Sequence, residues 1–203
     1  MMRKCLIIIL LVVLVSLAGA AEFTDYKVIA VSSPLINQIY ANPELSDLED
    51  VQLTPDSQIK LYENLSDDIC KTLIDKFKDK ITVICFSDIQ SKLDDDTWDE
   101  FNRLFTGHDQ VDTTFSRDIA SKLKAGAVFD SYLMFNYYQD DKDKRRLEVH
   151  FEWYLVDLKS GESVLSDKYD CEDEFTGFPS SWEKEYHCFA GIVDSIASYK
   201  GAK

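Results

Sequence analysis

Apolar residues recur with a helical period in the first half of the chain. Leucine, isoleucine or phenylalanine occupies every fourth position over residues 61–77, with mostly polar residues between them. This spacing places the apolar side chains on one face of an amphipathic helix. Shorter helices are predicted after the acids at 94–96 and after Asp112, because carboxylates stabilise a helix N-terminus. A final helix is predicted after Ser181.

Strands are predicted where apolar residues are contiguous. Residues 26–31 form a short β-rich stretch. Residues 81–86 are apolar nearly throughout, which predicts a strand in the centre of a sheet. The segment between them that begins at residue 32 and ends at 55 is rich in turn formers, so it is predicted to be a loop.

The C-terminal part of the chain changes to a period of two. Strands are predicted over 127–138, 146–157 and 163–169, joined by one charged turn and one glycine-containing turn. Successive strands joined by short turns form an antiparallel meander. The sequence therefore predicts one α+β domain, residues 21–203, with a mixed sheet and a C-terminal antiparallel meander packed by amphipathic helices.

The first twenty residues have the order of a secretory signal peptide. Two basic residues precede an apolar run, and the small residues at 18–20 close it. Cleavage is expected after Ala20, with cleavage after Ala21 as the alternative. The run is shorter than the roughly 20 residues that span a bilayer, and an uncleaved membrane anchor stays the second interpretation. Residues 1–20 are thus predicted to be a signal peptide, and the mature chain to be periplasmic or secreted.

The composition is strongly acidic. The chain has 22 Lys and Arg against 37 Asp and Glu, a formal charge of −15. Loss of the leader, which holds two basic residues and no acid, leaves −17. Such a surface repels phosphate backbones and anionic lipid headgroups, which argues against nucleic acid partners and against a peripheral membrane role. The mature chain is also predicted to have no transmembrane span.

Four cysteines stay in the mature chain, and an even number permits disulfides in an oxidising compartment. The sequence contains no C-x-x-C motif and no H-x3–5-H motif, so a zinc site is not expected. The favoured pair is Cys171 with Cys188, which would connect the end of the meander to the C-terminal helix. Cys70 and Cys85 are either a second disulfide or two buried thiols.

The order of short motifs between residues 119 and 167 resembles a known group of domains. A helix end leads to Gly126-Ala127 and a strand, and a later strand ends in Val156-Asp157, followed by Ser160-Gly161 and a third strand. This order resembles bacterial envelope domains: the curli-secretion lipoprotein family, the amino-terminal domain of the Tol-Pal translocation protein, and lipoprotein activators of penicillin-binding proteins. The resemblance implies the α+β fold, an envelope location, and a non-enzymatic assembly, docking or regulatory role.

One face of the predicted meander carries a mixture of aromatic, amide, carboxylate and imidazole groups, because side chains two apart on a strand point the same way. Tyrosine adds contact area and a hydrogen bond at low entropic cost, so this mixture suits binding. The alternatives are a face covered by a helix and an ordinary solvated face. His150 is interpreted as a solvated side chain rather than a metal ligand. The candidate binding residues are Tyr132, Asn136, Tyr138, Glu148, His150, Glu152 and Tyr154.

Other chemistry finds little support in the sequence. The acidic clusters at 94–100, 140–143 and 172–174 lack the EF-hand pattern, and helix capping, a hairpin tip and a charged loop explain them. The three histidines lie in no catalytic motif. No catalytic residue, metal site or cofactor is therefore predicted. The favoured function is an exported, non-enzymatic envelope protein that docks on, assembles or regulates a partner protein. The alternative is an extracytoplasmic protein that binds a small molecule or cation on the tyrosine-rich sheet face.

Overall fold

The computed structural model describes residues 22–40, 55–104, 113–139, 144–176 and 185–199. The strands are β1 (Val28–Val31), β2 (Leu35–Tyr40), β3 (Thr82–Ile84), β4 (Ala127–Gln139), β5 (Lys144–Asp157) and β6 (Ser163–Thr176). The helices are η1 (Phe23–Asp25), α3 (Pro55–Phe77), α4 (Phe86–Ile89), η2 (Gln90–Lys92), α5 (Asp95–Leu104), α6 (Thr113–Leu123) and α7 (Glu185–Ser198).

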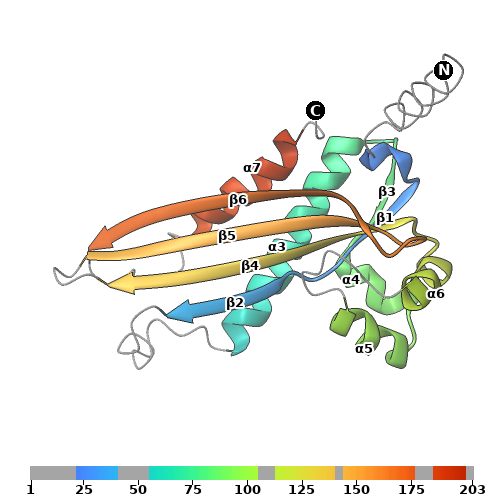
Figure 1. The fold of residues 1–203 in the computed structure, drawn as a ribbon, viewed down its shortest axis with the longest axis horizontal. Helices are drawn as coiled ribbons and strands as arrows, with labels where there is room; N and C mark the ends of the chain where they lie inside the picture. Colours follow the sequence, from blue (N-terminus) through green and yellow to red (C-terminus); the bar gives the residue numbers. More distant parts are fainter. Residues whose placement is uncertain (1–21, 41–54, 105–112, 140–143, 177–184, 200–203) are drawn as a thin grey trace, which may run out of the picture.

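The six strands form one mixed sheet in the order β3-β1-β4-β5-β6, with β2 paired to β4 farther along its length. The β1 strand is parallel to both β3 and β4, whereas β4, β5 and β6 form an antiparallel meander. The long strands of the meander project well beyond the end of the sheet where β1 and β3 lie (Figure 1). The fold is thus α+β, and the predicted mixed sheet with its C-terminal meander is confirmed.

The predicted loop after residue 32 is wrong in part, because this segment contains β2. Both β1 and β2 pair in parallel with β4, with Val31 opposite Phe129 and Leu35 opposite Tyr132. Pro34 lies between the two strands, where it has no N–H to offer a ladder. The turn-forming residues therefore mark a break between two strands along the same edge of β4.

The β3 strand is an edge strand, not the central strand that its apolar sequence predicts. Helices cover it on both faces, which explains the apolar run. Val83 packs against the cluster that α3 covers, and Ile84 belongs to the cluster on the opposite face. An edge strand that is buried on both faces has the same sequence pattern as a central one.

The larger hydrophobic core lies between the sheet and helices α3 and α7. Leu65, Ile69 and Leu73 of α3 are buried there, which confirms the four-residue spacing of the predicted helix. Trp153 of β5 lies in the middle of this core, with its ring centroid 5.2 Å from that of Phe129. Large rings packed in this way provide much of the apolar burial that stabilises a domain of this size.

The second core covers only one end of the opposite face. Phe101 of α5 and Ile119 of α6 pack there against Val128 and Val156 of the sheet. Among the residues that the structure describes, the remaining, projecting part of this face contributes no member to either buried cluster. We call this part the open half-face. Its members are Tyr132, Met134, Asn136, Glu148, His150, Glu152, Lys168, Asp170 and Glu172.

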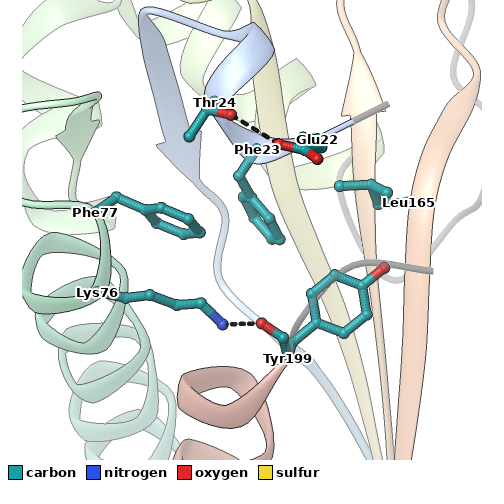
Figure 2. Close-up of a pocket in the computed structure, with 7 residues that line it drawn as sticks. All are labelled: Glu22, Phe23, Thr24, Lys76, Phe77, Leu165 and Tyr199. Atoms are coloured by element: carbon teal, nitrogen blue, oxygen red, sulfur yellow. Dashed lines mark hydrogen bonds between the residues drawn. The ribbon is translucent and has the colours of Figure 1, made fainter. Parts of the chain in front are cut away.

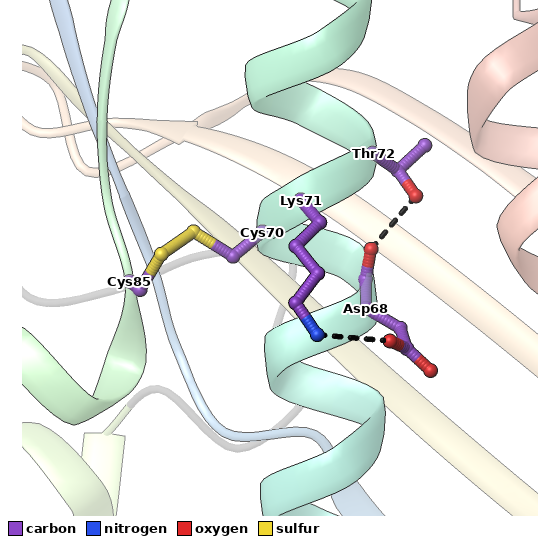
Figure 3. The surroundings of a disulfide bond; sticks show 5 residues. All are labelled: Asp68, Cys70, Lys71, Thr72 and Cys85. Atoms are coloured by element: carbon purple, nitrogen blue, oxygen red, sulfur yellow. Dashed lines mark hydrogen bonds and ion pairs between the residues drawn. A yellow bond between two sulfur atoms is a disulfide. The ribbon is translucent and has the colours of Figure 1, made fainter.

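Two disulfide bonds attach the covering helices to the sheet. Cys70 of α3 is bonded to Cys85, directly after β3, with Cα atoms 5.5 Å apart (Figure 3). Cys171 of β6 is bonded to Cys188 of α7, with Cα atoms 5.9 Å apart. Each bond closes a short loop, of 15 and 17 residues, which corresponds to roughly 3 kcal/mol in the chain-entropy treatment.

The residues of the Val-Asp and Ser-Gly motif form the turn between β5 and β6. Asp157 Oδ1 accepts hydrogen bonds from the backbone N–H groups of Lys159 (2.9 Å) and Ser160 (2.8 Å), and Oδ2 accepts one from the Tyr26 hydroxyl (3.0 Å). Gly161 has a φ of 75°, which glycine adopts without strain. Burial acts to raise the pKa of Asp157, but these hydrogen bonds outweigh it and lower the pKa. The motif therefore has a structural role here.

Candidate binding surface

The strand register brings the candidate residues of β4 and β5 together on one face. Tyr132 lies opposite Glu152, and Asn136 lies opposite Glu148; on this face one pair lies between them, Met134 with His150. Tyr138 lies opposite Arg146 in the same register, but its side chain is outside the described part of the structure. Directly opposite side chains of an antiparallel pair are about 4.5–5.5 Å apart at Cβ, so they form one continuous surface.

Tyr154 lies at the boundary between the covered end and the open half-face. Its ring packs against the second core, and its hydroxyl donates a hydrogen bond to Glu152 Oε2 (2.6 Å). The opposite residue on β4 is Asp130, a fully buried carboxylate. Asp130 Oδ1 accepts hydrogen bonds from the Ser32 hydroxyl (2.7 Å) and the Ser131 N–H (2.9 Å). Tyr154 is thus partly a core residue, and its hydroxyl contacts the open half-face through Glu152.

His150 is the centre of a hydrogen-bonded chain across β5 and β6. Its Nε2 lies 2.8 Å from Glu152 Oε1, and its Nδ1 contacts Asp170 Oδ1. An imidazole donates from both nitrogens only when it is protonated. Burial acts to lower the pKa of His150, but the hydrogen bonds and charges of Asp170 and Glu152 outweigh it and raise the pKa. His150 is therefore a held, half-buried bridge between carboxylates, not the freely solvated side chain that the sequence predicts.

The chain also fixes the ionisation of its carboxylates. Hydrogen bonds from the Tyr154 hydroxyl and from His150 lower the pKa of Glu152. The Tyr154–Glu152–His150–Asp170 chain therefore holds Glu152 in its charged form and limits the rotamers of its neighbours. Side chains held in this way lose less conformational entropy when a ligand contacts them.

The contribution of β6 to this surface was not predicted from the sequence. The strand continues to Thr176, so the interpretation of residues 172–174 as a charged loop is wrong. Asp170 lies opposite His150, and Glu172 lies opposite Glu148. Acidic residues are rare in strands, so the composition of this segment does not predict a strand. The sequence pattern that could have predicted this strand is the alternation of polar residues with Tyr169 and Cys171, whose side chains point toward α7.

An open hollow lies in the middle of the surface, between β4, β5 and β6. It is lined by side chains from all three strands: Met134, Asn136, Glu148, His150, Asp170 and Glu172. At its rim, Arg146 Nε lies 2.9 Å from Glu172 Oε1, and Lys168 Nζ lies 3.9 Å from Asp170 Oδ2. Four carboxylates on the open half-face thus face two permanent cations and one titratable imidazole.

The described residues contain no group of three His, Cys, Asp or Glu side chains that are arranged to hold a metal ion. The two ring nitrogens of His150 point to different carboxylates and so do not converge on a common site. The first acidic cluster caps a helix, since Asp94 Oδ1 accepts a hydrogen bond from the Thr97 N–H (2.9 Å), whereas the cluster at 140–143 lies outside the described residues.

No helix in the described part of the chain is both long enough and apolar enough to cross a membrane.

A second hollow lies at the other end of the molecule, between η1, α3 and the end of α7 (Figure 2). The Lys76 ammonium donates hydrogen bonds there to the carbonyl oxygens of Ile196 (2.7 Å) and Tyr199. A cation at the C-terminal carbonyls of a helix stabilises that helix end. Burial lowers the pKa of Lys76. This hollow is therefore a packing junction, in which Lys76 connects two helices.

No protein-family model and no curated protein matches the chain. Similar solved structures include lipoprotein GNA1162 from Neisseria meningitidis, with 14% identity, a TM-score of 0.42, and 85% of this chain and 99% of that chain covered. A putative neuraminyllactose-binding hemagglutinin homolog from Helicobacter pylori has 13% identity, a TM-score of 0.42, and coverage of 90% and 89%. The LpoB C-terminal domain from Escherichia coli has 15% identity, a TM-score of 0.31, and coverage of 78% and 92%. At these TM-scores the similarity identifies no function for this chain.

Proposed function

We propose that this protein works outside the cytosol as a non-enzymatic docking module, which binds another protein of the cell envelope through the open half-face. The observation that carries the proposal is the unequal cover of the sheet. In the described part of the chain, helices α3 and α7 pack on one face, whereas α4, α5 and α6 pack on only one end of the other. The uncovered part presents half-exposed aromatic, amide and charged side chains on rigid strands.

Two features support the compartment. The leader predicts export, and both cysteine pairs of the mature chain are bonded as disulfides, which persist mainly in oxidising compartments. The resemblance of the 119–167 segment to bacterial envelope domains supports the same location.

The composition and shape of the open half-face support a protein partner over the alternative of a small-molecule ligand. Small-molecule sites are concave, largely apolar and enclose most of the ligand. The open half-face is instead broad and polar, with Tyr132, Met134 and Asn136 along β4. Aromatic residues and methionine are enriched at protein interfaces, and side chains already held by hydrogen bonds cost little entropy on binding.

Site-specific photocrosslinking in the producing cell tests the proposal. The photoreactive residue p-benzoylphenylalanine is placed at Asn136 on the open half-face, and at Asp194, an exposed residue of α7 on the other side of the sheet, as the control. We expect a discrete adduct with one envelope protein from position 136 and none from position 194. The purified partner must then protect backbone amides of β4 and β5 from hydrogen exchange. Equal crosslinking from both positions, or no protection by the captured protein, refutes the proposal.

A further inference from the structure

Glu148 differs from the other carboxylates of the open half-face. Glu152 and Asp170 contact His150, and Glu172 is paired with Arg146. Among the residues that the structure describes, Glu148 has no hydrogen-bond or ion-pair partner, although its side chain is half-buried in the wall of the hollow.

The residues around Glu148 also favour a cation at this position. Its direct neighbour on β6 is Glu172, and like charges directly opposite each other destabilise a pair of strands. Arg146 forms an ion pair with Glu172, and no described cation forms one with Glu148. A positive group in the hollow would give Glu148 an ion-pair partner and reduce its repulsion from Glu172.

The other walls of the hollow fit a cation on an apolar stem. Asn136 lies directly opposite Glu148 and has no hydrogen-bond partner among the described residues, so its amide oxygen is available as an acceptor. Met134 lies two residues away on β4 and on the same face, and it adds a half-buried thioether chain. A guanidinium or ammonium group can thus donate to the carboxylate and the amide, while its methylene stem packs on the methionine.

We propose that the docking partner inserts an arginine or lysine side chain from a basic segment into this hollow, where Glu148 pairs with its charge and Asn136 accepts a further hydrogen bond. This inference rests on the proposed docking function and specifies the partner's chemistry. The acidic net charge of the chain favours such a partner, because complementary charge both speeds association and excludes acidic competitors.

The probe for this inference is an acetylated and amidated tri-arginine peptide, titrated into the isotope-labelled mature protein and followed by amide chemical shifts. The peptide with citrulline in place of arginine is the matched neutral probe. We expect the largest shifts at Asn136, Glu148 and Glu172, and no saturable shifts with citrulline. The variant Glu148→Gln should weaken peptide binding about tenfold, as expected for one charge-assisted hydrogen bond. Asp194→Asn removes the same charge elsewhere and should weaken it less than about twofold.

Three results would overturn the inference. These are shifts scattered over the whole acidic surface, equal weakening by Glu148→Gln and Asp194→Asn, or equal binding of the citrulline peptide. A thermal melt of each variant shows that the fold is kept. If position 136 crosslinks an envelope protein that binds the Glu148→Gln variant as tightly as the unmodified chain, the charge pair is wrong and the docking function stands. If position 136 crosslinks nothing above the Asp194 control, the docking function itself fails.

Discussion

Gly191 of α7 provides a test of how β6 faces the helices. A Cβ built on Gly191 would lie 1.9 Å from Tyr169 Oη and 2.4 Å from Tyr169 Cζ, distances that unbonded atoms do not hold. In a helix interior, replacement of glycine by alanine ordinarily stabilises a protein by about 1 kcal/mol, because glycine loses more backbone entropy on folding. Here the added methyl group must displace the Tyr169 ring, so the sign should reverse.

The size of the effect follows from these two terms. Overpacking a fitted contact costs about 1–3 kcal/mol, and the helix propensity of alanine returns about 1 kcal/mol. Gly191→Ala is therefore expected to lower the free energy of unfolding by up to about 2 kcal/mol. For a domain of this size, that corresponds to a melting temperature lower by up to about 8 °C.

A double-mutant cycle makes the test specific to this contact. In a Tyr169→Ala background the obstructing ring is absent, so Gly191→Ala should stabilise the protein by about 0.5–1 kcal/mol. Urea unfolding of the four oxidised proteins measures each free energy. Stabilisation by Gly191→Ala in both backgrounds would show that Tyr169 does not lie against α7. The orientation of β6 would then be wrong, and with it the outward placement of Asp170 and Glu172.

Three further predictions concern covalent and titratable groups. Replacing both Cys171 and Cys188 by serine should lower the free energy of unfolding by about 2–4 kcal/mol; an unchanged urea midpoint would mean that the pair is not bonded in solution. The raised pKa of His150 means that its bridge stabilises the fold fully below the unfolded-state pKa and that this contribution is lost as the pH rises through the folded-state pKa. The stability gap to His150→Gln should therefore be larger at acidic than at basic pH, and a gap that widens with pH would contradict the bridge. Asp157→Asn should cost about 1–2 kcal/mol at neutral pH. Because the pKa of Asp157 is lowered, that cost should shrink as the pH falls through the folded-state pKa, and a constant cost in the same urea series would contradict the turn's hydrogen bonds.

The parts of the fold that local periodicity determines were predicted from the sequence. The four-residue spacing through Leu65, Ile69 and Leu73 identifies α3 and its buried face, and the period of two identifies the meander. The position of a strand within the sheet is different, because it depends on which helices cover it. Thus β3 has the sequence of a central strand and lies at an edge. The β2 strand was missed because Pro34 and its neighbours indicate a turn before the strand resumes.

The candidate surface, too, could be predicted from the sequence only in part. Alternation along two strands was enough to select Tyr132, Asn136, Glu148 and His150 as neighbours. The ion pairs were not accessible in this way, since they depend on the register between β5 and β6. The acidic end of β6 looked like a loop, which hid Asp170 as the second partner of His150.

The unequal cover of the two sheet faces separates the residues that stabilise the fold from those of the open half-face. Substitutions at Tyr132, Asn136 or Glu148 remove no member of either buried cluster, so they sacrifice little apolar burial. Leu133 and Trp153 are buried and each lies one strand position away from an open residue, so they have no such freedom. Side chains of the open half-face can therefore be changed position by position, as on an antibody loop, while the helices behind the sheet keep the domain folded.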